Sequence, residues 1–351
     1  MKYRTSFFIL LTVFILSSCV QKNEIIEKNI SDTINDPLNI DDYYLSITGS
    51  FNDDESVLNE VYAVYDFSEN SIDKLLSVKA TSTYPCGVCD LTNNIVYYSA
   101  ADEVIIGERN ILLDNVFSYD INTHNTTQIT NYGYYMNRLI PVDDKLLFAG
   151  GRRSSAAVEF GWIDLSDNTV FYPECYSDVS TINVRDIAYS YVDESVYISW
   201  YSLSEQTQLD KEYRLKLDNG DASASRELAE YHLDKFYLSN STALSVDSFR
   251  DFQLETIAIS QTGDKIFMYG LQGETSIRLH DNNQTSDFTY PGSALAVMSP
   301  DGTSLYYISI SETQSNGVPC TILNKYDFLS NSTEEITYFD FYINNMILLR
   351  K

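Results

Sequence analysis

The sequence predicts an all-β fold, a six-bladed β-propeller of four-stranded antiparallel blades, with seven blades as the alternative. Three observations support this fold. One hairpin pattern recurs along the chain, a second hairpin pattern follows it, and the chain has 28 Tyr and 17 Phe against only 14 Gly. Aromatic residues favour strands. Because a single four-stranded sheet cannot bury both of its faces, repeated sheets are expected to pack against one another in a ring.

The clearest copy of the first hairpin is Ala296–Ser309, AVMSPDGTSLYYIS. An apolar strand reaches a Ser-Pro-Asp-Gly turn, and a strand with alternating aromatic residues leaves it. Pro300 presets φ for the turn, and Gly302 supplies the permissive backbone at its end. The same design reappears at residues 187–200 and 257–270, and looser copies are residues 91–100 and 139–150. Each copy predicts the first two strands of one blade.

In the second hairpin an apolar strand ends in Asp, and a polar turn leads to another strand. Its copies are Val64–Val78, Ser118–Thr130 and Lys325–Thr337. The SPDGTSLYY segment and these Tyr-Asp turns resemble the propeller repeat of the TolB and dipeptidyl-peptidase-IV type, in weak copies over residues 40 to 351. The resemblance implies a propeller. The peptidases with such repeats keep their nucleophile in a separate α/β-hydrolase domain, for which this chain has no room.

The first 18 residues predict a lipoprotein signal peptide. Lys2 and Arg4 give a positive start, and Phe7–Leu16 is an apolar run too short to span a membrane as a mature helix. The Leu-Ser-Ser-Cys that follows resembles the bacterial lipobox, which implies cleavage before Cys19 and attachment of lipid, palmitate included. Several acyl chains suffice for stable anchoring. The alternative is an ordinary secretory signal with a chance cysteine.

Residues 19–41 are polar and poor in aromatics, which predicts a flexible tether, and residues 42–351 then form the propeller domain. The formal net charge is −27. Such a charge repels phosphate backbones and anionic headgroups, so no nucleic-acid partner is expected. No second long apolar run follows. The sequence therefore predicts an extracytoplasmic protein of the bacterial cell envelope that meets the membrane through its lipid.

The spacing of the repeats predicts six blades. The second strands of these blades should begin near Tyr43, Asn94, Lys145, Ser195, Lys265 and Ser304, with one long interval. That interval predicts an insertion near residues 226–253, part of which has helical character. The first blade begins at its second strand, whereas Tyr342–Leu349 resembles a first strand without a blade. Pairing the two closes the ring and removes its open edges.

Three Tyr-Pro pairs predict a binding site at one mouth of the channel. Each pair stands where the last strand of one blade should cross to the first strand of the next, and such crossings cluster around the channel. Cysteines follow two of the pairs, and two arginines precede comparable first strands. The candidate binding residues are Tyr84, Cys86, Cys89, Arg138, Tyr172, Cys175, Arg185 and Tyr290. Tyr suits partner recognition, but the alternative is that each pair only fixes its crossing.

The thiols allow three interpretations. A disulfide between Cys86 and Cys89 suits an oxidising compartment. Unpaired structural cysteines would act as small hydrophobes. Metal binding or redox chemistry is the third, although no helix signal follows Cys89 to stabilise a thiolate and a single CxxC is a weak zinc signal. Cys320 lies in another predicted strand without an evident partner.

Catalytic constellations are missing from the sequence. His124, His232 and His280 lack spaced partners, and no nucleophile elbow, phosphate loop or dinucleotide fingerprint occurs. We expect no catalytic residue, metal or cofactor, and a function as a lipid-anchored binding or assembly module with a protein or small-molecule partner at the propeller mouth. The alternative is a propeller hydrolase or lyase with a divalent metal in the channel, which needs several ligand side chains on the axis.

Overall fold

The computed structural model describes residues 38–81, 85–106, 109–131, 134–152, 157–176, 181–221, 223–272, 274–281, 284–289, 292 and 295–351. The chain divides into two units, and the described residues belong to the second, Leu38–Lys351. The predicted signal peptide, Cys19 and nearly all of the predicted tether lie outside the described residues.

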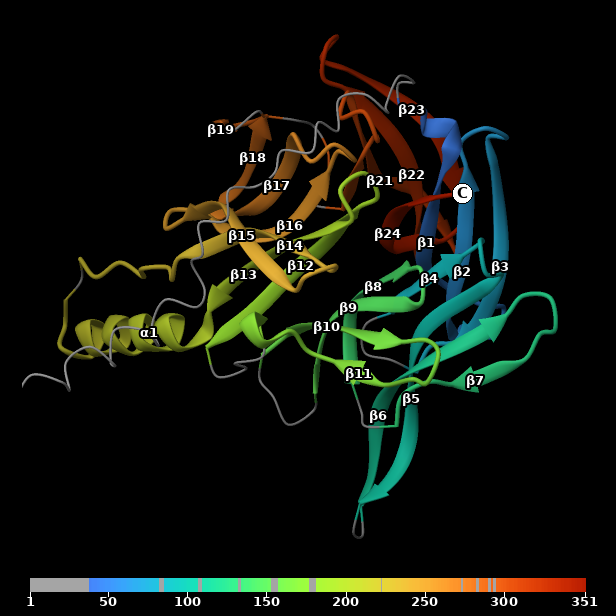
Figure 1. Cartoon of the computed structure of the whole chain (residues 1–351), viewed down its shortest axis with the longest axis horizontal. Coiled ribbons are helices and arrows are strands. Elements are labelled where there is room, and N and C mark those ends of the chain that lie inside the picture. Colours follow the sequence, from blue (N-terminus) through green and yellow to red (C-terminus); the bar gives the residue numbers. More distant parts are fainter. Residues whose placement is uncertain are drawn as a thin grey trace, which may run out of the picture. The chain divides into compact units, whose positions relative to one another are not determined.

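Six four-stranded antiparallel sheets follow one another around a ring (Figure 1), which confirms the predicted six-bladed β-propeller. The first blade consists of β24 (Tyr342–Arg350), β1 (Tyr43–Asn52), β2 (Leu58–Asp66) and β3 (Ser71–Lys79). The second consists of β4 (Gly87–Asp90), β5 (Ile95–Ile106), β6 (Arg109–Asp120) and β7 (Thr126–Gln128). The third consists of β8 (Tyr134–Val142), β9 (Lys145–Arg152), β10 (Glu159–Asp164) and β11 (Val170–Phe171).

The remaining three blades are built in the same way. The fourth consists of β12 (Ile182–Ser190), β13 (Ser195–Ser202), β14 (Tyr231–Tyr237) and β15 (Thr242–Phe249). The fifth consists of β16 (Gln253–Ile259), β17 (Lys265–Gln272), β18 (Glu274–Asp281) and β19 (Gln284–Asp287). The sixth consists of β20 (Ala296–Met298), β21 (Ser304–Ser315), β22 (Val318–Asp327) and β23 (Ser332–Phe339). The innermost strands, beside the central channel, are β24, β4, β8, β12, β16 and β20.

The carboxy-terminal strand closes the ring, as predicted. β24 pairs antiparallel with β1 from Tyr43 opposite Arg350 to Ser50 opposite Tyr342. β24 therefore supplies the innermost strand of the first blade, and the edge of β1 is not left open.

A repeated contact holds the closing crossing in place. Phe341 lies against Gly49, where an added Cβ would come within 2.3 Å of the Phe341 ring. The ammonium of Lys74 lies 5.3 Å from the Phe341 ring centroid and 2.7 Å from the Asp340 carboxylate. The crossing from the fourth to the fifth blade has the same contacts, made by Phe252, Gly270, Arg278 and Asp251. The closing crossing thus has the same construction as an ordinary one.

The two ends of the blades differ in their connections. We call the end where one blade crosses to the next the crossing face, and the opposite end the turn face. Because neighbouring strands are antiparallel, the connection between the second and third strands of a blade also lies on the crossing face. Where the structure describes them, the connections of the turn face are short turns, such as Asp143-Asp144 between β8 and β9.

The insertion lies earlier than the sequence predicted. Residues 226–253 contain β14 and β15 of the fourth blade, and a helix, α1 (Leu203–Asp218), precedes them on the crossing face. The Ser202 side chain caps this helix by accepting from the backbone N–H of Glu205 at 3.2 Å. Among its residues only Gln206 is buried. The helix lacks the apolar periodicity by which a sequence reveals a packed helix.

Buried apolar side chains fill the spaces between neighbouring blades. The largest of these clusters combines residues of the first four blades, including Tyr44, Tyr62, Phe148 and Phe236. The described residues also form two short helices, η2 (Ile40–Asp42) and η3 (Glu174–Tyr176). Within the described part of the chain, no helix has the length and apolarity to cross a membrane.

Candidate functional site

Four polar residues form a layer across the channel, which we call the polar belt: Cys86, Arg138, Asp186 and Asn345. Arg138, Asp186 and Asn345 each follow a β-bulge in the innermost strand of a blade. Their partners on the neighbouring strands are Ala149, Ser199 and Thr48, in that order. Cys86 precedes β4, and its carbonyl accepts from the Ser99 backbone N–H. A bulge re-aims the side chain beside it, and in this protein it brings polar groups from different blades together.

Arg138 is the centre of the polar belt. Its Nε donates to Asp186 Oδ1 at 2.9 Å and its Nη2 donates to Oδ2 at 3.0 Å, an ion pair between the third and fourth blades. Its Nη1 donates to Asn345 Oδ1 at 2.5 Å and to the Met346 carbonyl at 3.3 Å. Arg138 therefore spans the channel to the first blade.

Asp186 neutralises this buried cation. The two side chains are only 12% and 5% exposed. Burial alone would lower the pKa of Arg138, but the adjacent Asp186 carboxylate outweighs burial and raises it. Asp186 Oδ1 also accepts from the backbone N–H of Ile187 at 2.9 Å, and Oδ2 accepts from that of Ile257 at 3.0 Å. Both carboxylate oxygens are thus occupied, so Asp186 is better suited to holding blades together than to catalysis.

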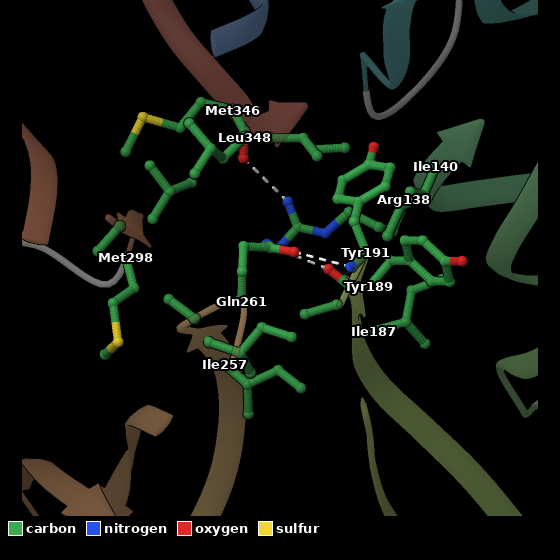
Figure 2. A pocket seen from close by; sticks show the side chains of 16 residues that line it. Arg138, Ile140, Ile187, Tyr189, Tyr191, Ile257, Gln261, Met298, Met346 and Leu348 are labelled. Carbon is green, nitrogen blue, oxygen red and sulfur yellow. Dashed lines mark hydrogen bonds between the residues drawn. The ribbon is translucent and has the colours of Figure 1, made fainter. Parts of the chain in front are cut away.

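A partly open cavity of about 50 Å³ lies between the polar belt and the turn face. Figure 2 shows Arg138 beside this space, surrounded by side chains of several blades. Most of the lining is aliphatic and comes from the innermost strands β8, β12, β16, β20 and β24.

Gln261 organises the cavity rim on the turn face. Its Oε1 accepts from the Tyr191 backbone N–H at 2.8 Å, and its Nε2 donates to the Tyr189 carbonyl at 3.4 Å. Its own backbone N–H donates to the Pro300 carbonyl at 2.9 Å. Three blades therefore meet at this one residue, which fixes the mouth of the cavity.

Of the singled-out residues that the structure describes, Cys86 and Arg138 are brought together in the polar belt. The cation of Arg138 lowers the pKa of the Cys86 thiol, but burial outweighs it and raises that pKa to about 12. Arg185, which was expected to face the channel, instead pairs with Glu255 of the fifth blade. Both Arg185 and Glu255 are bulge residues, so the bulge moves Asp186 into the place the sequence suggested for Arg185.

Cys86 and Cys89 are separate buried thiols, so the disulfide alternative is not realised. Three residues of extended chain place their Cα atoms about 10 Å apart on opposite faces of the sheet. A disulfide requires a separation below about 7 Å. Burial raises the pKa of Cys89 to about 12 as well, which disfavours a reactive thiolate. Cys175 is exposed in η3, and Cys320 is buried.

The Tyr-Pro pairs can be assessed at one crossing. The Tyr172 ring packs edge-on against Phe148, with the ring centroids 5.8 Å apart. This contact matches the alternative in which the pair fixes the crossing. Tyr84 and Tyr290 lie outside the described residues.

Asp186, Asn345 and Gln261 were missed as site residues. Aligning the hairpin copies places Gln261 opposite Pro300, but neither residue type stands out as a ligand. Across the described ranges, no group of three or more His, Cys, Asp or Glu side chains is arranged to hold a metal ion. His232 stacks on Trp200 at 4.2 Å, and His280 contacts Thr285 at 2.9 Å, so both are tied to neighbouring strands.

Comparisons with solved structures agree with the fold. The chain is similar to TolB from Acinetobacter baumannii, with a TM-score of 0.57, 13% identity and coverage of 89% of this chain and 68% of that one. It is also similar to a chain of a nidogen/laminin complex, with a TM-score of 0.53, 7% identity and coverage of 87% and 98%. No protein-family model matches the sequence, and no curated protein matches it significantly. At these identities the likeness establishes the propeller fold alone.

Proposed function

We propose that this protein is a lipid-anchored, extracytoplasmic binding or assembly module of the bacterial cell envelope, and that its partner binds the crossing face. A propeller whose polar belt pairs its charged side chains within the channel is a rigid scaffold. On such a scaffold, binding residues are carried by the connections.

The connections of the crossing face are elaborated. β5 and β6 have 12 residues each, whereas β4 of the same blade has four. They extend beyond the rest of their blade as a two-stranded ribbon (Figure 1). β21 and β22 also form a long hairpin, and its tip residue Asn316 exchanges hydrogen bonds with Asn52 at 2.9 and 3.1 Å. The helix α1 belongs to the same face.

Exposed apolar side chains also gather at this end, and this observation carries the proposal. Among the described residues, the large exposed apolar side chains near the crossing face are Leu58, Leu215, Leu217, Ile310 and Tyr338. Phe171, Leu244 and Leu329 lie nearer the turn face. Apolar side chains left exposed on one side of a protein indicate an interaction surface.

The partner can be tested with matched variants. Ile310→Asp, at a side chain 63% exposed, should abolish cross-linking of a specific partner from an envelope fraction. Leu329→Asp, at a side chain 94% exposed on the turn face, is the control and should leave that partner bound. Both variants should melt like the wild type. Equal capture by both variants, or equal loss, would contradict a partner on the crossing face.

The anchor is tested separately. Cys19→Ser should prevent lipidation and move the protein from the detergent phase to the aqueous phase of a Triton X-114 partition. Mass spectrometry of the mature wild type should give a mass that includes the diacylglyceryl group, which would support lipidation directly. If the wild type and the variant both remain in the detergent phase, the attachment does not depend on Cys19.

A further inference from the structure

The cavity on the turn side of the polar belt has the features of a ligand site separate from the proposed partner face. Its walls include Ile140, Ile187, Ile257, Met298 and Met346, which come from five different blades. Figure 2 shows these side chains around a common space. Because five blades contribute to it, the propeller holds its shape without any ligand.

Arg138 forms the polar end of this cavity. Its contacts use four of the five N–H bonds that a guanidinium has, two with Asp186, one with Asn345 and one with the Met346 carbonyl. Among the contacts of the described residues, one N–H on Nη2 therefore remains to donate to a ligand. No rearrangement of the polar belt is needed for this donation.

The charge at this end selects the class of ligand. Asp186 already balances Arg138, so the pair presents no net charge to the cavity. A carboxylate would have to compete with Asp186, which is held by the backbone N–H groups of Ile187 and Ile257 as well. An ammonium would meet the guanidinium directly and lose its hydration. A neutral group with an acceptor oxygen meets neither obstacle.

We propose that this cavity binds a small neutral aliphatic molecule that carries one hydrogen-bond acceptor oxygen, of the size and chemistry of a short primary alcohol. The oxygen accepts from Arg138 Nη2, and the alkyl chain lies against the Ile and Met side chains. A cavity of about 50 Å³ holds about four water molecules, which corresponds to a chain of four to six heavy atoms.

The methionines make the test direct. The chain has five; Met298 and Met346 line the cavity, whereas Met136 and Met268 are buried elsewhere. In protein labelled with 13C at the methionine methyl groups, 1-pentanol should shift the Met298 and Met346 signals saturably and leave those of Met136 and Met268 in place. Pentanoate and pentylammonium should bind at least about tenfold more weakly, because each brings a charge into an apolar space.

Variants provide the control. Ala258→Leu fills the cavity from β16 and should abolish the pentanol-induced shifts, whereas Ala243→Leu on the exposed side of β15 should preserve them. If Ala258→Leu fails to fold, Ala188→Leu fills the same space from β12. Three results would overturn the inference: no saturable shift at Met298 and Met346, equal shifts at all four buried methionines, or pentanoate binding as tightly as 1-pentanol.

Discussion

Replacing Glu60 with Gln should remove a pH-dependent loss of stability. Glu60 lies on β2 and is only 1% exposed. Its Oε2 accepts from the Tyr62 hydroxyl at 2.5 Å, while its Oε1 has no hydrogen-bond partner within the part of the chain that the structure describes. Burial raises the pKa of Glu60 from 4.5 to about 7; the Tyr62 hydrogen bond acts in the opposite direction, and the charge of Asp114 adds to the increase.

The sign and size of the effect follow from this pKa. Below about pH 4.5 both the folded and the unfolded chain hold the proton on Glu60. Between about pH 4.5 and 7 only the folded protein keeps it, so the free energy of unfolding decreases as the pH rises through this range. The change is about 3 kcal/mol, since each pH unit corresponds to about 1.4 kcal/mol. Gln cannot ionise and should not show this loss.

Urea unfolding of wild type and Glu60→Gln between pH 4 and 8 measures the difference. The variant should gain about 3 kcal/mol over the wild type across this range, with little difference at pH 4. Glu69→Gln, at an exposed position in the same blade, is the control and should follow the wild-type pH dependence. Parallel pH profiles for wild type and Glu60→Gln would refute the reasoning.

Three further perturbations test the fold and the site. Deleting Tyr342–Lys351 removes β24, and the loss of at least about 5 kcal/mol should prevent cooperative melting by circular dichroism; an unchanged melting temperature would show that the ring closes elsewhere. Arg138→Leu should destabilise the protein by about 3 to 5 kcal/mol because it leaves Asp186 buried without its cation. Adding Asp186→Leu should restore much of this loss in a double-mutant cycle. Additive losses of the two substitutions would contradict the coupling between the two side chains. Tyr172→Ala should cost about 3 kcal/mol by removing the contact with Phe148 while leaving partner capture intact; loss of capture without loss of stability would instead make Tyr172 a binding residue.

The sequence predicted the blade in detail wherever the determining contacts are local. At Ala296–Ser309 the pattern of two strands around Pro300 and Gly302 appears as β20 and β21, and Gly302 has the positive φ of 69° that its place in the turn required. The Tyr-Asp turns and their equivalents behave in the same way: the αL positions at Asn70, His124, Asn168 and Asn331 each stand four residues after an Asp. The absence of a first strand before β1 in the sequence also indicated that β24 had to pair with β1.

One feature was misplaced and another was left undecided, each for a physical reason. The helix α1 is stabilised by its cap and by side-chain pairs such as Gln206–Asp210 at 2.9 Å, not by a buried face, so its sequence carries no periodic signal. For Cys86 and Cys89 the sequence left a disulfide and unpaired buried cysteines as alternatives, and the structure has the unpaired form. The chain between them is extended and separates the two thiols, which their spacing in the sequence could not reveal.

The sequence by itself determined most of the hairpins and their turns, the number of blades and the closing strand, because hairpin pairing depends on residues that are close together in the chain. Only the tertiary structure decided the polar belt and the cavity. Arg138 meets Asn345 across 207 residues of sequence, and a bulge of one residue exchanges Arg185 for Asp186 at the channel. Such contacts depend on how the blades are arranged around the axis and on single-residue shifts in register, and neither leaves a local pattern in the sequence.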